Sequence, residues 1–294
     1  MTAGAAQPSI LIILTWFGPW PGWIRPFLES CRWNASVDWL IAGDSAPPDD
    51  APPNVRFLTL SFEAWRAMAA RRLGVGLDWR EPYKLCDLKP AYAVIHAEHV
   101  SPYDVWGFGD LDVIYGDIRR HYDAATLAHD LVTTHDDVVA GHFTLLRNAE
   151  RMVRAYERIP GWRKMFADPA HVSFDEQVFS RLFLPLKGKQ KLRRLTTPFL
   201  GGGVFVERFS TAIPPRRWID GTTNWPERWI WREGRLTAQG APDRDFLYLH
   251  FSHWQSARWT RGAPAAWAGL DLLDSLPPGR PTQFAISAQG FTPA

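Results

Sequence analysis

Short apolar runs alternate with amphipathic segments along the first part of the chain. Residues 9–15 (SILIILT), 37–42 (VDWLIA) and 55–60 are apolar and rich in β-branched side chains, which is typical of strands buried on both faces. A helix is expected at residues 23–32, and Ser61 is placed to cap the helix that follows the third strand. This alternation predicts an α/β fold, with a mostly parallel central sheet and helices on both of its faces.

The pattern continues through the middle of the chain. Residues 89–99 are predicted to form a helix with Pro90 in its first turn, and this helix leads into a strand at residues 103–107. Further strands are expected at residues 131–134 and 143–146, and further helices at residues 150–159 and 174–183.

Beyond residue 200 the pattern changes. Residues 218–231 alternate aromatic and polar side chains, which predicts an aromatic-rich β extension, and residues 233–235 supply a turn. The last apolar strand is expected at residues 246–251. The chain is therefore expected to form one domain over residues 1–275 with a loosely ordered tail over residues 276–294, where Pro and Gly recur.

Composition narrows the class of protein. Of 294 residues, 46% are hydrophobic and 22% are charged, which excludes a disordered, collagenous or coiled-coil chain. The net charge of +2 argues against a nucleic-acid partner. Cys31 and Cys86 match neither a disulfide framework nor a zinc motif, and the N-terminus lacks the basic start of a signal peptide, so a cytoplasmic location is expected.

The strongest chemical signal is the segment at residues 106–112 (WGFGDLD), which follows an apolar strand. Alternate side chains of an extended segment share a face, so Asp110 and Asp112 can meet one hard cation. Mg²⁺ and Mn²⁺ prefer such oxygen ligands and share their other positions with phosphate and water. The alternative is that both are ordinary turn carboxylates.

A histidine near the end of the last strand is a candidate third ligand. His250 lies inside that strand on the face of Tyr248, whereas His253 lies beyond it. Either histidine could complete the coordination of a cation, and His250 is favoured. His250 could equally be a hydrogen-bonded core histidine.

Two other groups of polar residues stand at predicted helix starts. Lys84, Asp87 and Lys89 precede a helix, where cations oppose the helix dipole and so point to an anionic ligand. The alternative is a solvated ion-pair cluster. Asp175 and Glu176 open a later helix, where capping explains them or where one acts as a general base toward an acceptor.

In their order, several blocks resemble a poorly characterised bacterial family related to GT-A glycosyltransferases. The blocks are residues 15–20 (TWFGPW), 38–41 (DWLI), 83–92 (YKLCDLKPAY), 109–117 (GDLDVIYGD) and 141–145 (GHFTL), extended by 174–176 and 249–251. The resemblance implies a Rossmann-like nucleotide-sugar fold, a DxD motif at Asp110 and Asp112 that binds Mn²⁺ or Mg²⁺, and a late histidine best matched by His250. It also implies that Asp87 contacts the donor, with Lys89 where arginine would be expected.

These observations together predict a metal-dependent glycosyltransferase of bacterial surface polysaccharide synthesis. The donor would be a UDP- or GDP-sugar bound by residues 9–120, and residues 121–275 would form the acceptor side. Because ligands of open α/β sheets bind beyond the carboxyl ends of strands, Phe17, Gly18 and Asp44 are expected to hold the nucleoside. The alternative is a non-catalytic glycan-binding protein on the same fold.

The acceptor is expected to be a glycan or a lipid-linked sugar. Residues 218–231, with Trp254 and Trp259, could present indole faces to sugar rings, although tryptophan is more often packed in a core. The basic run at residues 187–194 could dock the enzyme peripherally on an anionic membrane. The usual alternative for such a run is a solvated loop.

Overall fold

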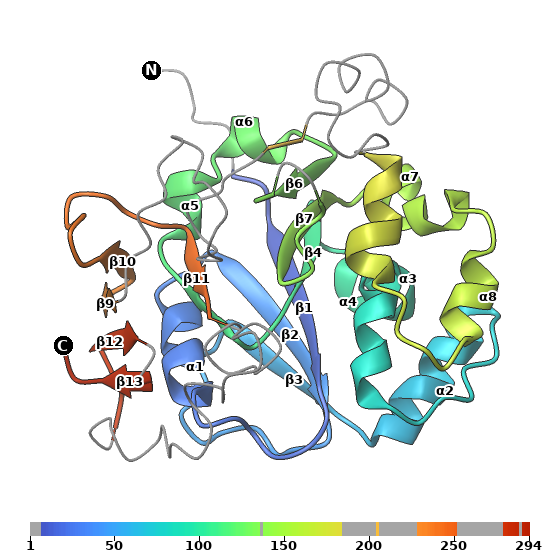
Figure 1. Cartoon of the computed structure of the whole chain (residues 1–294), viewed down its shortest axis with the longest axis horizontal. Coiled ribbons are helices and arrows are strands. Elements are labelled where there is room, and N and C mark those ends of the chain that lie inside the picture. Colours follow the sequence, from blue (N-terminus) through green and yellow to red (C-terminus); the bar gives the residue numbers. More distant parts are fainter. Residues whose placement is uncertain (1–6, 136–137, 184–203, 206–227, 252–278, 288–289) are drawn as a thin grey trace, which may run out of the picture.

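A computed structural model describes residues 7–135, 138–183, 204–205, 228–251, 279–287 and 290–294 of the chain (Figure 1). Within this part, the centre is a seven-stranded sheet with the order β3-β2-β1-β4-β7-β6-β8. Its strands are β1 (Ile10–Trp16), β2 (Val37–Gly43), β3 (Val55–Thr59), β4 (Val105–Gly109), β6 (Leu131–Thr133), β7 (Phe143–Arg147) and β8 (Val204–Phe205).

The sheet is parallel over its first half and mixed beyond it. β1 pairs in parallel with β2 and with β4, and β2 pairs in parallel with β3. β7 runs antiparallel to both β4 and β6, whereas β8 is parallel to β6. The predicted α/β class with a mostly parallel sheet is therefore confirmed, and its parallel strands end together at one edge.

The continuous apolar sequence of β1 follows from burial on both sides of the sheet. Ile10, Ile12 and Leu14 belong to one core cluster, whereas Leu11 and Ile13 belong to another. Since both sets of alternating side chains are removed from water, no polar position interrupts the strand.

Different kinds of element cover the two faces (Figure 1). On one face lie α1 (Ile24–Arg32) and the strands of two smaller sheets. On the other lie α2 (Phe62–Leu73), α3 (Tyr92–Ile95), α4 (Ala97–Val100), α7 (Glu150–Val153) and α8 (Trp162–Ala167). The expectation of helices on both faces holds, but one face is covered largely by β structure.

Local signals place α2 as predicted. The Ser61 side chain accepts a hydrogen bond from the backbone N–H of Ala64, so Ser61 is the N-cap. Gly74 ends the helix in the left-handed region, with φ of 63°.

The segment before β4 differs from its prediction. In place of one helix at residues 89–99, the chain forms the 3-10 helix η1 (Pro82–Ala91) followed by the short helices α3 and α4. Pro90 has no N–H to donate and sits near the end of η1 rather than in a first turn. β4 also lies two residues later than predicted, so that it ends directly before Asp110.

The remaining predicted helices form as shorter pieces. Residues 150–159 divide into α7 and the 3-10 helix η2 (Ala155–Arg158), and residues 174–183 divide into the π-helix η3 (Phe174–Val178) and the 3-10 helix η4 (Phe179–Leu182). Two further single-turn helices, α5 (Ile118–His121) and α6 (Ala124–Leu127), begin at the side-chain caps Asp117 and Asp123.

Two small sheets lie beside α1 (Figure 1). One has the order β10-β9-β12-β13 and consists of β9 (Arg228–Arg232), β10 (Arg235–Ala238), β12 (Gln283–Ser287) and β13 (Gly290–Thr292). The other is an antiparallel pair of β5 (Val113–Tyr115) and β11 (Tyr248–His250). The predicted turn between β9 and β10 is present, with positive φ at Glu233 and Gly234.

The structure corrects the prediction of a loosely ordered tail. β12 lies between β9 and β13, and Phe284, Ile286 and Phe291 are fully buried. Arg280 also donates two hydrogen bonds to the carboxylate of Glu29 on α1, at 3.0 and 2.7 Å. The Pro and Gly residues of this segment therefore lead into a sheet rather than a free end.

The same sheet corrects part of the acceptor prediction. Trp229 and Trp231 have no exposed surface and pack in the core beside Phe246 and Phe284, so they cannot stack on a sugar. The rest of the predicted aromatic surface, including Trp254 and Trp259, lies outside the described residues, as do His253 and the basic run at residues 187–194. No helix among the described residues is both long enough and apolar enough to span a bilayer.

Candidate functional site

Three parallel strands deliver predicted site residues to one edge of the central sheet. β1, β2 and β4 end at Trp16, Gly43 and Gly109, so Phe17, Asp44 and Asp110 follow at neighbouring strand ends. Ligands of open α/β sheets bind at this edge. The structure thus brings the two predicted groups, one for the nucleoside and one for the metal, to the same side of the fold.

The first loop at this edge is tied to the second. The backbone N–H of Gly18 donates to Asp44 Oδ1 at 2.7 Å, and Gly18 has φ of 112°, which L side chains rarely adopt. The Phe17 ring packs edge-on against Phe62, with ring centroids 5.2 Å apart. The Asp44 carboxylate thus shapes the loop, and its contact with a nucleoside stays a prediction.

Asp112 and His250 meet although they lie far apart in sequence. β11 pairs with β5 so that His250 lies opposite Val113, and the backbone N–H of Phe251 donates to the carbonyl oxygen of Asp112 at 3.1 Å. This pairing leaves His250 Nε2 3.6 Å from Asp112 Oδ1. Both side chains keep some exposure, 12% for His250 and 20% for Asp112, so the pair is within reach of a ligand.

The charge of Asp112 depends on its neighbours. Burial opposes ionisation of Asp112, but the nearby imidazole of His250 and the ammonium of Lys89 outweigh burial and lower the pKa of Asp112. For Asp110 the balance is reversed. Burial, with Asp112 beside it, raises the pKa of Asp110 even though Lys89 opposes this. Lys89 thus supplies positive charge to both carboxylates.

The residues present fit a divalent cation. The 3.6 Å between His250 Nε2 and Asp112 Oδ1 is too long for a hydrogen bond, whereas two ligand atoms of one octahedral ion lie about 3 Å apart. The carboxylate of Asp112 and the imidazole of His250 are donors that suit Mn²⁺ or Mg²⁺ together with phosphate oxygens.

Lys89 connects the DxD segment to Asp175. Its ammonium donates to Asp110 Oδ1 at 2.6 Å and to the carbonyl oxygen of Gly141 at 2.9 Å, and it lies 3.7 Å from Asp175 Oδ2. Burial opposes the charge, but Asp110 and Asp175 outweigh it and hold the pKa of Lys89 well above its usual range. Lys89 is therefore a buried cation between two carboxylates.

Asp175 and Glu176 do not serve as ordinary helix caps. They lie on the π-helix η3, which follows Ser173 in the left-handed region with φ of 51°. Asp175 is buried, and this burial, reinforced by Glu176 and Asp110 and opposed by Lys89, raises the pKa of Asp175 to about 8. A π-turn and a strained residue beside a perturbed carboxyl are common at functional sites.

Gly141 allows these carboxylates to approach the centre of the site. A Cβ atom at this position would lie 2.7 Å from Asp175 Oδ2 and 2.9 Å from Glu176 Oε1. Any side chain at residue 141 would therefore displace both carboxylates. In the sequence, Gly141 stands only within a block of the resemblance, and no role is predicted for it.

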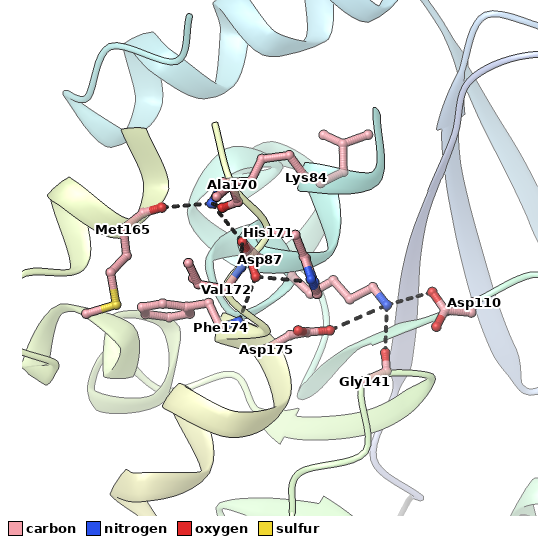
Figure 2. A network of polar contacts seen from close by, with 12 residues as sticks. Lys84, Asp87, Asp110, Gly141, Met165, Ala170, His171, Val172, Phe174 and Asp175 are labelled. Carbon is pink, nitrogen blue, oxygen red and sulfur yellow. Dashed lines mark hydrogen bonds and ion pairs between the residues drawn. The ribbon is translucent and has the colours of Figure 1, made fainter. Parts of the chain in front are cut away.

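The structure corrects the prediction that Lys84 and Asp87 face a ligand. Both are buried, with 1% and 0% of the side chain exposed, and the Lys84 ammonium lies 2.7 Å from Asp87 Oδ2. Lys84 also donates to the carbonyl oxygens of Met165 and Ala170, at 2.9 and 2.6 Å (Figure 2). They form an ion pair, as the alternative had it, but one enclosed by protein rather than by solvent.

Asp87 holds the turn that leads to Asp175. Its two carboxylate oxygens accept hydrogen bonds from the backbone N–H groups of Val172, at 2.9 Å, and Phe174, at 2.6 Å, on either side of the strained Ser173 (Figure 2). Asp87, His171 and Asp175 also place ligand atoms within 4.8 Å of one another, a grouping that could hold a metal ion. Because both Asp87 oxygens already accept hydrogen bonds, this grouping is less suited to a cation than Asp112 and His250.

One residue of the site was not found from the sequence. His142 is buried next to Gly141, and its ring stacks on His250 with centroids 3.9 Å apart and planes 14° apart. Its only signal in the sequence is its place in the block at residues 141–145 (GHFTL).

Comparisons with known proteins identify a family but no activity. The model of a family of unknown function (DUF6625) matches residues 12–263. No curated protein matches the chain. A solved structure, the glycosyltransferase GlyE in Streptococcus pneumoniae TIGR4, aligns with a TM-score of 0.34 and 8% sequence identity, over 60% of this chain and 43% of that chain. So remote a likeness carries no functional argument, and less than half of that protein's length is spanned.

Proposed function

Because this chain belongs to DUF6625, a family of unknown function, we propose an activity for it from its own site: a metal-dependent glycosyltransferase that uses a nucleotide-diphosphate sugar. The observation that carries the proposal is the meeting of Asp112 with His250 beside Asp110, at the edge where β1, β2 and β4 end. This edge suits a nucleotide, and the donor set suits a cation with a diphosphate.

The chain's own residues divide the work of binding the donor. Asp112 and His250, with Asp110 beside them, would hold the cation, which would supply positive charge to stabilise the departing diphosphate. Lys89 keeps Asp110 directed into the site through its 2.6 Å contact. The loop of Phe17 and Gly18, shaped by Asp44, faces the nucleoside.

Asp175 is the candidate general base. In an inverting transfer, its carboxylate takes the proton of the acceptor hydroxyl while that oxygen bonds to the anomeric carbon of the sugar. The bond from this carbon to the phosphate oxygen breaks, and the nucleoside diphosphate leaves with its electron pair. The buried position of Asp175 beside Lys89 and Glu176 supports this role because it keeps the carboxyl poised near neutral pH.

The wider assignment is also part of the proposal. The donor is a UDP- or GDP-sugar, and the acceptor is a glycan or a lipid-linked sugar of a bacterial surface polysaccharide, used at the cytoplasmic face of the membrane. The alternative of a non-catalytic glycan-binding protein needs tryptophans as stacking surfaces for sugars and uses the carboxylates to hold a structural cation. It has less support because Trp229 and Trp231 are buried.

Binding of nucleoside diphosphates tests the proposal. We expect UDP or GDP to bind in the presence of Mn²⁺ or Mg²⁺ and not in EDTA, because Asp110 and Asp112 repel phosphate unless a cation lies between them. Isothermal titration calorimetry of the full chain, with each nucleotide and each metal, measures this. Equal binding in EDTA would contradict a metal-dependent site, and the preferred base narrows the donor.

The rate of transfer should depend on the protonation of Asp175. A base must be ionised, and the pKa of Asp175 is raised to about 8. We therefore expect kcat/KM to rise about tenfold per pH unit below that value and to level off above it. The measurement is a pH profile with the UDP- or GDP-sugar whose nucleotide binds.

Two variants assign this profile to a residue. Asp175→Asn should abolish the pH-dependent rate, whereas Glu176→Gln should keep the rising limb, because Glu176 is not the proton acceptor in this scheme. If Asp175→Asn retains the full profile, the general base is another group.

A further inference from the structure

We infer that His142 is a positioning residue that holds both arms of the candidate metal site, Asp110 through its backbone and His250 through its ring. The inference rests on the proposed function in one respect, that Asp110, Asp112 and His250 bind a divalent cation. It assigns a role to a residue that would touch neither the cation nor the substrate.

The backbone of His142 fixes the start of the DxD segment. Its carbonyl oxygen accepts a hydrogen bond from the backbone N–H of Asp110 at 3.1 Å. This bond continues the antiparallel pairing of β4 with β7, in which Gly109 lies opposite Phe143. Asp110 therefore leaves the sheet from a defined position, although it has already passed the end of β4.

The ring of His142 fixes His250 from the side. The two imidazoles are nearly parallel, with planes 14° apart and centroids separated by 3.9 Å. A flat ring at this distance restricts rotation of the His250 ring about its side-chain bonds. His250 Nε2 thus stays directed toward Asp112, 3.6 Å from Oδ1.

The His142 ring is itself held in place. His142 Nε2 lies 2.6 Å from the hydroxyl oxygen of Tyr248, and this hydroxyl also hydrogen-bonds with Thr134 Oγ1. Tyr248 and His250 lie two residues apart on β11, so they share a face of that strand. One strand therefore carries both the ligand and the group that anchors the ring stacked on it.

Loss of the His142 ring should lower the affinity for the cation, in addition to any loss of stability. The orientation of a histidine ligand is set by its neighbours, and loss of such a neighbour costs about 10- to 100-fold in metal affinity. We therefore expect His142→Ala to weaken binding of Mn²⁺ by about that factor. His142→Phe loses the contact with Tyr248 but keeps a flat ring that the surrounding packing confines to the stack, so it should bind Mn²⁺ within about threefold of the unchanged chain.

The matched control is His96, another buried histidine. It lies away from the DxD segment, contacts Trp65 and Tyr92, and takes a hydrogen bond from Trp65 Nε1 at 3.3 Å. His96→Ala should lower stability by creating a cavity but leave the affinity for Mn²⁺ unchanged.

The experiment is a titration of the full chain and the three variants with Mn²⁺ alone. Binding is measured by calorimetry and by the electron paramagnetic resonance signal of free Mn²⁺. The titrations are carried out at a temperature at which circular dichroism shows every variant to be folded. The inference is supported if His142→Ala loses affinity while His142→Phe and His96→Ala keep it. It is overturned if His142→Ala binds like the unchanged chain, or if His142→Phe is as weak as His142→Ala. An unchanged chain that binds no Mn²⁺ overturns the metal-dependent function itself and the positioning role with it.

Discussion

Replacing Asp112 with asparagine is expected to weaken metal-dependent binding of UDP or GDP by at least about 100-fold, since a ligand should matter no less than the neighbours that orient ligands. The asparagine has the same shape but only one acceptor oxygen and no charge, so the fold should be unaffected. Calorimetry with Mn²⁺ and each nucleotide measures the loss, and a thermal unfolding curve checks the fold.

Asp117→Asn is the matched control for this change. Asp117 lies on the same segment, but its carboxylate caps α5 by accepting a hydrogen bond from the backbone N–H of Arg120 at 3.1 Å. Its replacement should cost at most about 1 kcal/mol of stability and leave nucleotide binding unchanged. Near-normal binding by Asp112→Asn would remove the proposed metal site.

The second large effect is expected from the buried pair Lys84–Asp87. Lys84→Met or Asp87→Asn should each lower the free energy of unfolding by about 3–5 kcal/mol, because each leaves its partner buried without the opposite charge. Asp87→Asn also weakens the hydrogen bonds that the backbone N–H groups of Val172 and Phe174 donate to residue 87. These bonds hold the turn at Ser173. Urea denaturation of each variant measures these changes.

Two further variants test whether the loss of stability comes from a buried charge left without its partner. The double variant Lys84→Met with Asp87→Asn should lose less stability than the sum of the single variants, because no unpaired charge stays buried. Arg72→Ala breaks an exposed ion pair with Glu98, whose side chain is 50% exposed, and should cost below about 1 kcal/mol. If the two buried variants cost no more than Arg72→Ala, the enclosed network is not what holds this region.

The parts of the fold that the sequence predicts are those set by local pattern. The continuous apolar run of β1 suits a strand that is covered on both faces. Ser61 caps α2 by accepting a hydrogen bond from the backbone of Ala64, only three residues away. The DxD segment was found because a strand end and two carboxylates are adjacent in sequence. His250 was found because it stands inside an apolar run.

The parts that the sequence does not predict depend on contacts between distant segments. Nothing near Lys84 shows that residues 165 and 170 will bring carbonyl oxygens to it, so its burial could not be foreseen. The raised pKa of Asp175 comes from burial, reinforced by Asp110 on another segment and opposed by Lys89. The tail looked loose because its Pro and Gly outweighed the short alternation at residues 283–287, whose partner strand β9 lies far upstream.

The pairing of β5 with β11 also bears on the order in which the protein folds. Closing a contact between distant segments costs more chain entropy than closing local ones, so pairings of this kind form late. The pairing of β1 with β2 joins closer segments, with Ile10 opposite Val37, and can form first. We therefore expect a refolding chain to regain the pairing of β1 with β2 before Asp112 meets His250, so that the capacity to bind Mn²⁺ returns after this early sheet structure.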